Sequence, residues 1–197
     1  MNQTLDHPAL VKSLRTAYSA EKAAAFAYIG HAGSVGAGPE REHIHEIEQD
    51  EWNHRREVKV IMDRFGLPVS SWYEFKYHVI GRVIGASCYV IGHFMPYFFA
   101  GKLESGNVCE YFVMIRHFHA LGITEFDDVL YEMGIKEKEH EVYFMEMIRD
   151  ARWLPLFERI FSWGATTSLN DVDLARNPTV ENAEDYCRNY RAKKTER

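Results

Sequence analysis

The chain has 197 residues, of which 46% are hydrophobic, so it is long enough for one domain with a sizeable core and too apolar to be disordered. A formal net charge of -6 argues against nucleic acid as a partner. Three cysteines, Cys88, Cys109 and Cys187, match neither a disulfide framework nor a CxxC metal site. We therefore expect reduced thiols in a cytoplasmic protein, and the N-terminal residues show no secretory pattern.

The first half of the chain predicts two long helices joined by a glycine-rich loop. Hydrophobic residues recur at helical spacing, and no alternating strand pattern appears. The first helix is expected from about Pro8 to His31 and ends in the loop GSVGAGPE, whose Pro39 suits the first turn of the next helix. The second helix is expected to continue to about Phe65, where GLPVSS breaks it.

The second half predicts three more long helices and a short one. They are expected over residues 72–94, over 103–121 and over 125–151, with Pro96 at a kink or boundary, and the short apolar segment LPLFERIFSWG follows them. Beyond Leu169 the sequence is polar and ends in a basic run. The pattern therefore predicts an all-α protein with a helical domain over residues 1–167 and a polar arm or tail over residues 168–197.

Residues 79–100 form an apolar stretch of membrane-spanning length, interrupted by Arg82, His93 and Pro96. We expect a buried or interfacial helix here, with peripheral membrane contact as an open alternative. One stripe of this segment carries small residues, namely Gly81, Gly85, Cys88 and Gly92. The stripe predicts either close packing against another helix or one wall of an apolar channel, with the opposite Val and Ile face covered by a partner chain or a membrane surface.

Six polar side chains interrupt the apolar stripes of the four long helices. They are Glu21, Glu51, His54, Glu110, Glu137 and His140. In an antiparallel hairpin, residues equidistant from the turn lie at one height, because each residue rises about 1.5 Å. The midpoint between Glu21 and Glu51 falls in the glycine loop, and the midpoint between Glu110 and Glu137 falls in LGITEFDD. Each hairpin is thus expected to place an acid opposite a Glu-x-x-His pair.

Other Glu-x-x-His matches, at Glu40 with His43 and Glu42 with His45, lie close to the loop and are expected at the rim. The mid-helix groups share helical stripes with apolar residues, so all six are expected to point into the bundle. The apolar members of the four stripes, in chain order, are Leu14, Ala17, Ala25 and Tyr28; Ile44, Ile47, Val58, Ile61 and Phe65; Leu103, Met114 and Leu121; and Leu130, Met133, Phe144 and Met147. Four buried carboxylates need positive charge among them, and two divalent metal ions supply it. Surface charges with chance spacing are the simpler alternative.

The arrangement of these motifs resembles the ferritin-like di-iron superfamily and, in its layout, the demethoxyubiquinone hydroxylases. The resemblance covers about residues 10–165 and includes the apolar third helix and EKEHE, in which an acid follows the Glu-x-x-His pair. It implies a ferritin-like four-helix bundle with an extra crossover helix and a short C-terminal helix. Family members typically have an aspartate just before the glutamate of the second Glu-x-x-His pair, where this chain has Lys136. The segment YSAEKAAAFAY around Glu21 also lacks the glycine-containing sequence that is usual in the family.

The resemblance implies a di-iron monooxygenase-type oxidoreductase that activates O2. Glu21, Glu51, His54, Glu110, Glu137 and His140 would hold the two irons, one of which manganese could replace. An apolar, quinone-like small molecule would be the substrate, with an external electron donor and a homodimeric assembly. The alternatives are a ferroxidase or iron-binding protein and a rubrerythrin-like peroxide scavenger, although the chain lacks the CxxC pairs of a rubredoxin domain.

Three further residues are expected beside the metal ligands. Asp50 could accept a hydrogen bond from a ligand histidine and orient it, as metal-bound imidazoles usually require. Tyr18 lies one helical turn before Glu21, and His117 lies two turns after Glu110. Each could tune the metal pair, and each could equally be an ordinary residue of the core or, for Asp50, of the surface.

Overall fold

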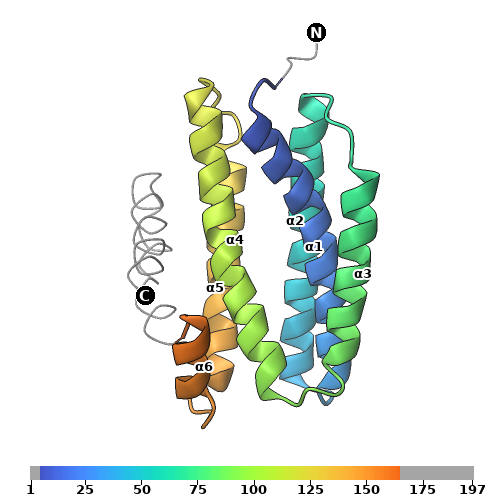
Figure 1. Ribbon diagram of the computed structural model, residues 1–197, viewed down its shortest axis with the longest axis vertical. Coiled ribbons are helices and arrows are strands. Elements are labelled where there is room, and N and C mark those ends of the chain that lie inside the picture. Colours follow the sequence, from blue (N-terminus) through green and yellow to red (C-terminus); the bar gives the residue numbers. More distant parts are fainter. Residues whose placement is uncertain (1–4, 165–197) are drawn as a thin grey trace. The chain divides into compact units, whose positions relative to one another are not determined.

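A computed structural model of the chain describes residues 5–164, which contain six helices and no strand (Figure 1). The helices are α1 (Pro8–Ser34), α2 (Pro39–Arg64), α3 (Ser71–Ser87), α4 (Phe94–Ala120), α5 (Asp127–Ile148) and α6 (Leu154–Phe161). The predicted all-α class is confirmed for this part of the chain. The predicted arm over residues 168–197 and Cys187 lie outside the described residues.

Local chemistry sets the helix boundaries. The His7 ring nitrogen Nδ1 accepts a hydrogen bond from the Leu10 amide at 3.1 Å, which caps the start of α1. Ser70 caps α3 in the same way through the Tyr73 amide at 3.4 Å. The helix predicted over residues 72–94 is shorter than expected, because α3 ends at Ser87 and a turn precedes α4. Pro96 lies in the first turn of α4, where a missing amide proton breaks no helical hydrogen bond.

The chain divides into two compact units, with the division between His93 and Phe94. In the first unit α1 packs against both α2 and α3 (Figure 1). Buried aliphatic side chains fill the space between these helices, including Leu14, Ile47 and Ile61. This unit therefore provides the first predicted hairpin, with a third helix alongside it.

Glycine contacts hold α3 against α1. A Cβ atom added to Gly30 would lie 2.3 Å from the Gly85 Cα atom, and one added to Gly81 would lie 2.5 Å from the Ala23 carbonyl oxygen. The two backbones therefore approach as closely as in small-residue helix contacts of membrane proteins. The channel-wall interpretation is wrong for Gly81 and Gly85, because the backbone of α1 fills the space beside them.

A polar network also connects α3 to α1 and α2, with Glu74 at its centre. The Glu74 carboxylate accepts hydrogen bonds from Ser19 Oγ at 2.8 Å, from Lys22 Nζ at 2.6 Å and from both terminal nitrogens of Arg55 at 3.0 Å. Partial burial opposes ionisation of Glu74, but these hydrogen bonds outweigh it and lower its pKa to about 2. The Arg55 guanidinium also lies 3.6 Å above the centre of the Tyr18 ring.

The second unit is built on α4 and α5, and aromatic contacts set the register of these two helices. Phe118 and Phe126 have ring centroids 5.0 Å apart, and those of Phe112 and Tyr131 are 5.4 Å apart. The short helix α6 packs against α4, where Phe157 contacts Phe98 at a centroid distance of 5.1 Å. Such pairs add roughly 0.5 to 1.5 kcal/mol each beyond the apolar area that they bury.

Cys88, at the end of α3, is a buried free thiol. Burial raises the pKa of this thiol.

The apolar stretch at residues 79–100 does not form one continuous helix. It is divided between α3 and α4 by the turn at residues 88–93, where Gly92 has a φ of 77°. None of the helices within residues 5–164 has the length and apolar character needed to cross a lipid bilayer.

Replacing Gly85 by alanine should destabilise the protein. The new Cβ atom would lie 2.6 Å from the Phe26 carbonyl oxygen, so the two helices must separate, and overpacking of this kind costs roughly 1 to 3 kcal/mol. Gly106→Ala is the matched control, since Gly106 also lies inside a helix and has no atom within 4 Å of an added Cβ. Thermal melting should show a lower melting temperature for Gly85→Ala and an unchanged or higher one for Gly106→Ala. Equal melting temperatures would contradict the close contact.

Candidate metal centre

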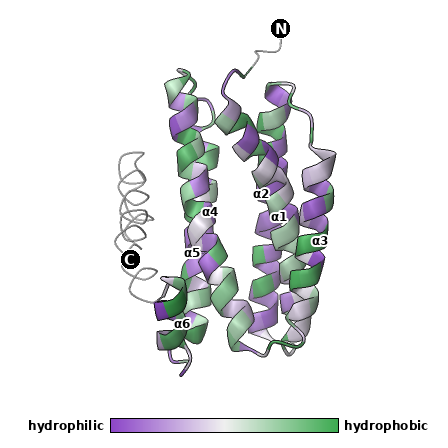
Figure 2. Ribbon diagram, viewed as in Figure 1, coloured by the Kyte–Doolittle hydropathy of each residue, from purple (hydrophilic) through white to green (hydrophobic). Residues whose placement is uncertain are grey.

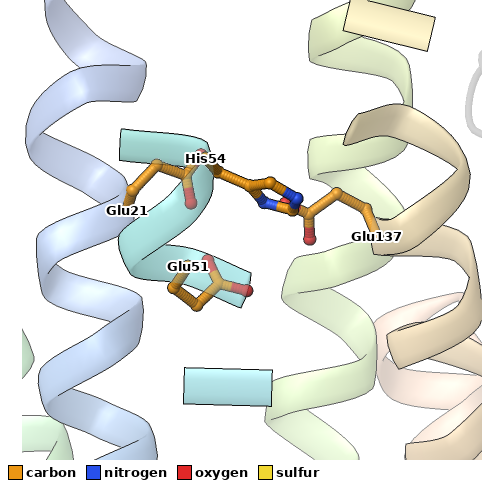
Figure 3. Close-up of side chains that lie close together, drawn as sticks. All are labelled: Glu21, Glu51, His54 and Glu137. Carbon is orange, nitrogen blue, oxygen red and sulfur yellow. The ribbon is translucent and has the colours of Figure 1, made fainter. Parts of the chain in front are cut away.

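The first unit brings together three predicted ligands, which we call the first half-site: Glu21, Glu51 and His54. Glu21 extends from the middle of α1, while Glu51 and His54 lie one turn apart on α2 (Figure 3). Their ligand atoms all lie within 4.8 Å of one another, and all three side chains are buried. Two carboxylates and an imidazole thus converge within the reach of one metal ion.

Helical periodicity explains why these polar side chains are buried. On α2 the same face carries Ile47, Val58 and Ile61, all of which are buried. Burying that apolar face on α1 necessarily turns Glu51 and His54 inward with it. The predicted stripes of α1 and α2 are confirmed, because each of their members is buried.

The second unit brings together Glu104, Glu137 and His140, which we call the second half-site. Their ligand atoms also lie within 4.8 Å of one another, and all three side chains are buried. Glu137, which extends from α5, is labelled in Figure 3. Asn107 donates a hydrogen bond from Nδ2 to the Glu104 carboxylate at 2.8 Å. The pattern of the first half-site therefore recurs, with one acid opposite a Glu-x-x-His pair.

The structure places Glu104, and not the predicted Glu110, in this half-site. Phe112 of α4 contacts Tyr131 and Gly134 of α5, which places Glu137 beside the turn of α4 around Asn107. Glu104 and Glu110 therefore lie about equally far along α4 from the level of Glu137. These two glutamates are six positions apart in the sequence, which sets them about 120° apart around the helix axis. Glu104 is buried, whereas Glu110 is only half-buried.

The face predicted for α4 was wrong, which explains why the sequence analysis missed Glu104. Leu103 and Leu121 were expected inside and are 57% and 37% exposed. Because both glutamates lie about equally far along α4 from Glu137, the face of α4 that is buried decides between them. Helical spacing of Tyr97, Gly101, Glu104 and Val108 is the signal that could have identified the buried face.

Two buried carboxylates lie close together in the second half-site, where like charges repel. Burial and the nearby negative charge of Glu137 raise the pKa of Glu104 well above its usual range, against the opposing effects of His140 and Asn107. The pKa of Glu110 is also raised by burial and by Glu137, so Glu110 lies near this half-site without joining the close group. Positive charge at the half-site would relieve this repulsion.

Two cations close in sequence to the ligands pair with other acids. Lys138, next to Glu137 in the sequence, is buried with Glu141 at 2.9 Å, and the Trp163 indole nitrogen donates to the same carboxylate at 2.9 Å. In the first unit Arg55, next to His54, pairs with Glu74 at 3.0 Å. These pairs were not anticipated from the sequence, and they direct the two protein cations to acids outside the half-sites.

The donor set fits divalent metal ions. Four buried carboxylates, from Glu21, Glu51, Glu104 and Glu137, carry four negative charges when ionised, which two divalent ions would balance. Carboxylates and imidazoles are ligands suited to iron, manganese and zinc. The buried Glu and His groups could therefore hold metal ions, and the chemistry of the donors does not by itself select iron.

The three residues predicted beside the ligands are less deeply buried. Asp50 and His117 are half-buried, and Tyr18 has its ring against Arg55. Their part in tuning a metal ion stays a prediction.

Comparisons of the chain with protein-family models, curated proteins and solved structures found no match.

In the metal-free protein, Glu104→Gln should reduce the dependence of stability on pH. The folded protein holds the Glu104 proton more tightly than the unfolded chain, so this group makes the free energy of unfolding rise as the pH falls towards the unfolded pKa near 4.5. His31, whose pKa burial lowers to about 4, contributes the opposite slope, so the wild type and the variant must be compared. The introduced glutamine amide can still accept a hydrogen bond from Asn107 and donate one to Glu137.

Urea unfolding of chelator-treated protein at several pH values measures this difference. Glu104→Gln should be more stable than the wild type near pH 8, with the two converging as the pH falls. Glu42→Gln, at an exposed acid on α2, is the control and should follow the wild type. A Glu104→Gln protein that is less stable than the wild type at pH 8 would contradict the repulsion.

Two metal ions should bind per chain, and single substitutions should identify their ligands. Glu51→Ala, Glu137→Ala and Glu104→Ala should each lose at least one ion, because each removes a buried carboxylate from a half-site. The rim variants Glu42→Ala and His45→Ala should keep both. Metal content of purified protein, measured by mass spectrometry, provides the test.

Glu110→Ala decides between the two acids of α4. It should retain both metal ions, because Glu110 lies outside the close group. Loss of metal from Glu110→Ala, together with retention by Glu104→Ala, would restore the assignment predicted from the sequence.

Proposed function

We propose that the two half-sites bind two iron ions and that the protein is an oxidoreductase that activates O2 to hydroxylate an apolar small molecule, quinone-like in character. The repetition of one observation supports this proposal: each hairpin buries a glutamate beside a Glu-x-x-His pair. This donor set is the one used by carboxylate-bridged di-iron and di-manganese bundles. A site for one metal ion would need only one glutamate with one Glu-x-x-His pair, whereas this chain has two such sets.

The proposal requires the two irons to act as a pair. A bound pair of ferrous ions would supply two electrons to O2, which carboxylate and imidazole side chains cannot do. Glu21, Glu51 and His54 of the first half-site and Glu104, Glu137 and His140 of the second would hold the ions through carboxylate oxygens and imidazole nitrogens. The six side chains of the two half-sites are all buried, which would keep bulk water from the reacting groups.

Electrons would come from outside the chain. Its three cysteines lack the CxxC spacing of a rubredoxin-type iron site, so a reduced partner protein or small molecule would be needed to return ferric ions to the ferrous state. The resemblance in layout to demethoxyubiquinone hydroxylases supports a quinone-like substrate. We also propose that the protein forms a homodimer and that manganese can replace one of the two irons.

The test is a single-turnover reaction. Anaerobic protein loaded with two ferrous ions per chain should consume O2 and incorporate one ¹⁸O atom from ¹⁸O2 into an added short-chain quinone substrate, detected by mass spectrometry. Glu137→Ala should reduce product to background, whereas Glu42→Ala should match the wild type. Magnetic coupling between the ferric ions, measured by Mössbauer spectroscopy, reports whether they form one pair.

Other outcomes would identify a different activity. Continued iron uptake beyond two ions per chain, with no oxygenated product, would indicate a ferroxidase or iron-binding protein. Rapid reduction of hydrogen peroxide by the diferrous protein, again without product, would indicate peroxide scavenging. Two uncoupled irons that leave O2 unreacted would exclude the proposed function.

A further inference from the structure

The outer face of α3 and the turn after it expose an unusual number of apolar side chains. We call this surface the docking face: Trp72, Phe75, Val79, Val83, Tyr89 and Val90. Val83 is 63% exposed and Val90, in the turn after α3, is 81% exposed. Ile84 and Ile91 beside them are also exposed, and hydrophobic residues continue toward the C-terminal end of α3 (Figure 2). Isolated exposed apolar residues are ordinary, but a continuous row marks an interaction surface.

The spacing of these residues makes the docking face a single stripe. On α3, Trp72, Phe75, Val79 and Val83 recur at intervals of three and four, so they lie along one side of the helix. The opposite side carries Gly81 and Gly85, which pack against α1. The docking face is therefore the side of α3 directed away from the core of its unit.

The exposed lysine and arginine side chains of α3 place positive charge beside the docking face. Lys76 and Arg82 are exposed on α3, and the acid of this helix, Glu74, is drawn inward by Lys22 and Arg55. Trp72 and Tyr89 stand near the two ends of the stripe, which are positions that aromatic side chains favour at a lipid–water interface. A surface that is apolar along its centre, basic at its margins and free of exposed acid on α3 complements an anionic lipid headgroup layer.

We infer that the docking face binds an anionic lipid bilayer, with α3 lying in the plane of the interface and Val90 inserted from the turn. α3 lies on the bilayer and does not span it, since no helix within residues 5–164 is long and apolar enough to cross. This inference stands on the first unit alone and does not depend on the proposed metal chemistry.

A second copy of the chain complements the docking face less well. It would bring the same basic residues, and antiparallel pairing of two α3 helices about Val79 would place Lys76 of one opposite Arg82 of the other. Like charges placed opposite one another destabilise such a pairing. Anionic lipid supplies the opposite charge to both residues.

Vesicle flotation of the full chain tests the inference. The wild type should float with vesicles of phosphatidylcholine containing about 30 mol% phosphatidylglycerol, more weakly with pure phosphatidylcholine, and less as salt increases. Val83→Glu and Val90→Glu should each reduce the bound fraction at least about tenfold. Val60→Glu is the matched control, because Val60 is an isolated valine on α2 with 60% exposure. Circular dichroism should show that all three variants retain their helices.

Two further variants separate the contributions. Lys76→Glu should remove the preference for phosphatidylglycerol, because it reverses a charge at the margin of the docking face. Trp72→Phe should bind normally but lose the blue shift of tryptophan fluorescence that vesicles cause in the wild type, since Trp72 would enter the interface.

Three results would overturn the inference. They are absence of wild-type flotation, equal loss of binding in Val60→Glu, and loss of binding in Ile160→Glu but not in Val83→Glu, which would assign binding to the exposed apolar face of α6. A lipid-free dimer that Val83→Glu dissociates, measured by light scattering, would show that a second copy covers the docking face in place of lipid.

Discussion

Buried carboxylates are the constraint around which both hairpins are built. Each half-site holds two acids and an imidazole with their ligand atoms within 4.8 Å of one another. Removing an ionised carboxylate from water costs several kcal/mol even after the surroundings relax. Arg55 and Lys138 lie next to the ligands in sequence but pair with Glu74 and Glu141, which are acids outside the half-sites. The helices around them must be stable enough to tolerate acids that repel one another.

The two units meet this demand with different packing. In the first unit aliphatic residues above and below Glu51 and His54 hold α2 in place, and the Glu74 network fixes α3 to both neighbours. In the second unit aromatic pairs join α4 to α5, and Trp163 packs beside Gly101 while donating its hydrogen bond to Glu141. In both units the packing around the half-site orients the acids, which is a requirement for precise metal ligation.

The glycine contact between α1 and α3 has a different consequence. Because Gly30, Gly81 and Gly85 let the two backbones meet directly, α3 is held by a narrow seam and by the Glu74 network. Its larger apolar side chains are then available on the other side. The side of α3 that faces α1 carries glycines, so the large apolar side chains of this helix lie on its outer side and form the docking face.

The sequence alone determined the helices, the inward faces of α1 and α2, and the recurrence of an acid with a Glu-x-x-His pair. Helical periodicity is a local property, so residues three or four apart are assigned to one face without knowledge of the partner helix. Only the tertiary structure decided between Glu104 and Glu110, because the choice depends on which face of α4 is buried against its neighbours. It also decided that Gly85 contacts the α1 backbone, since a row of small residues permits either a groove or a contact, and the path of the neighbouring helix selects one of them.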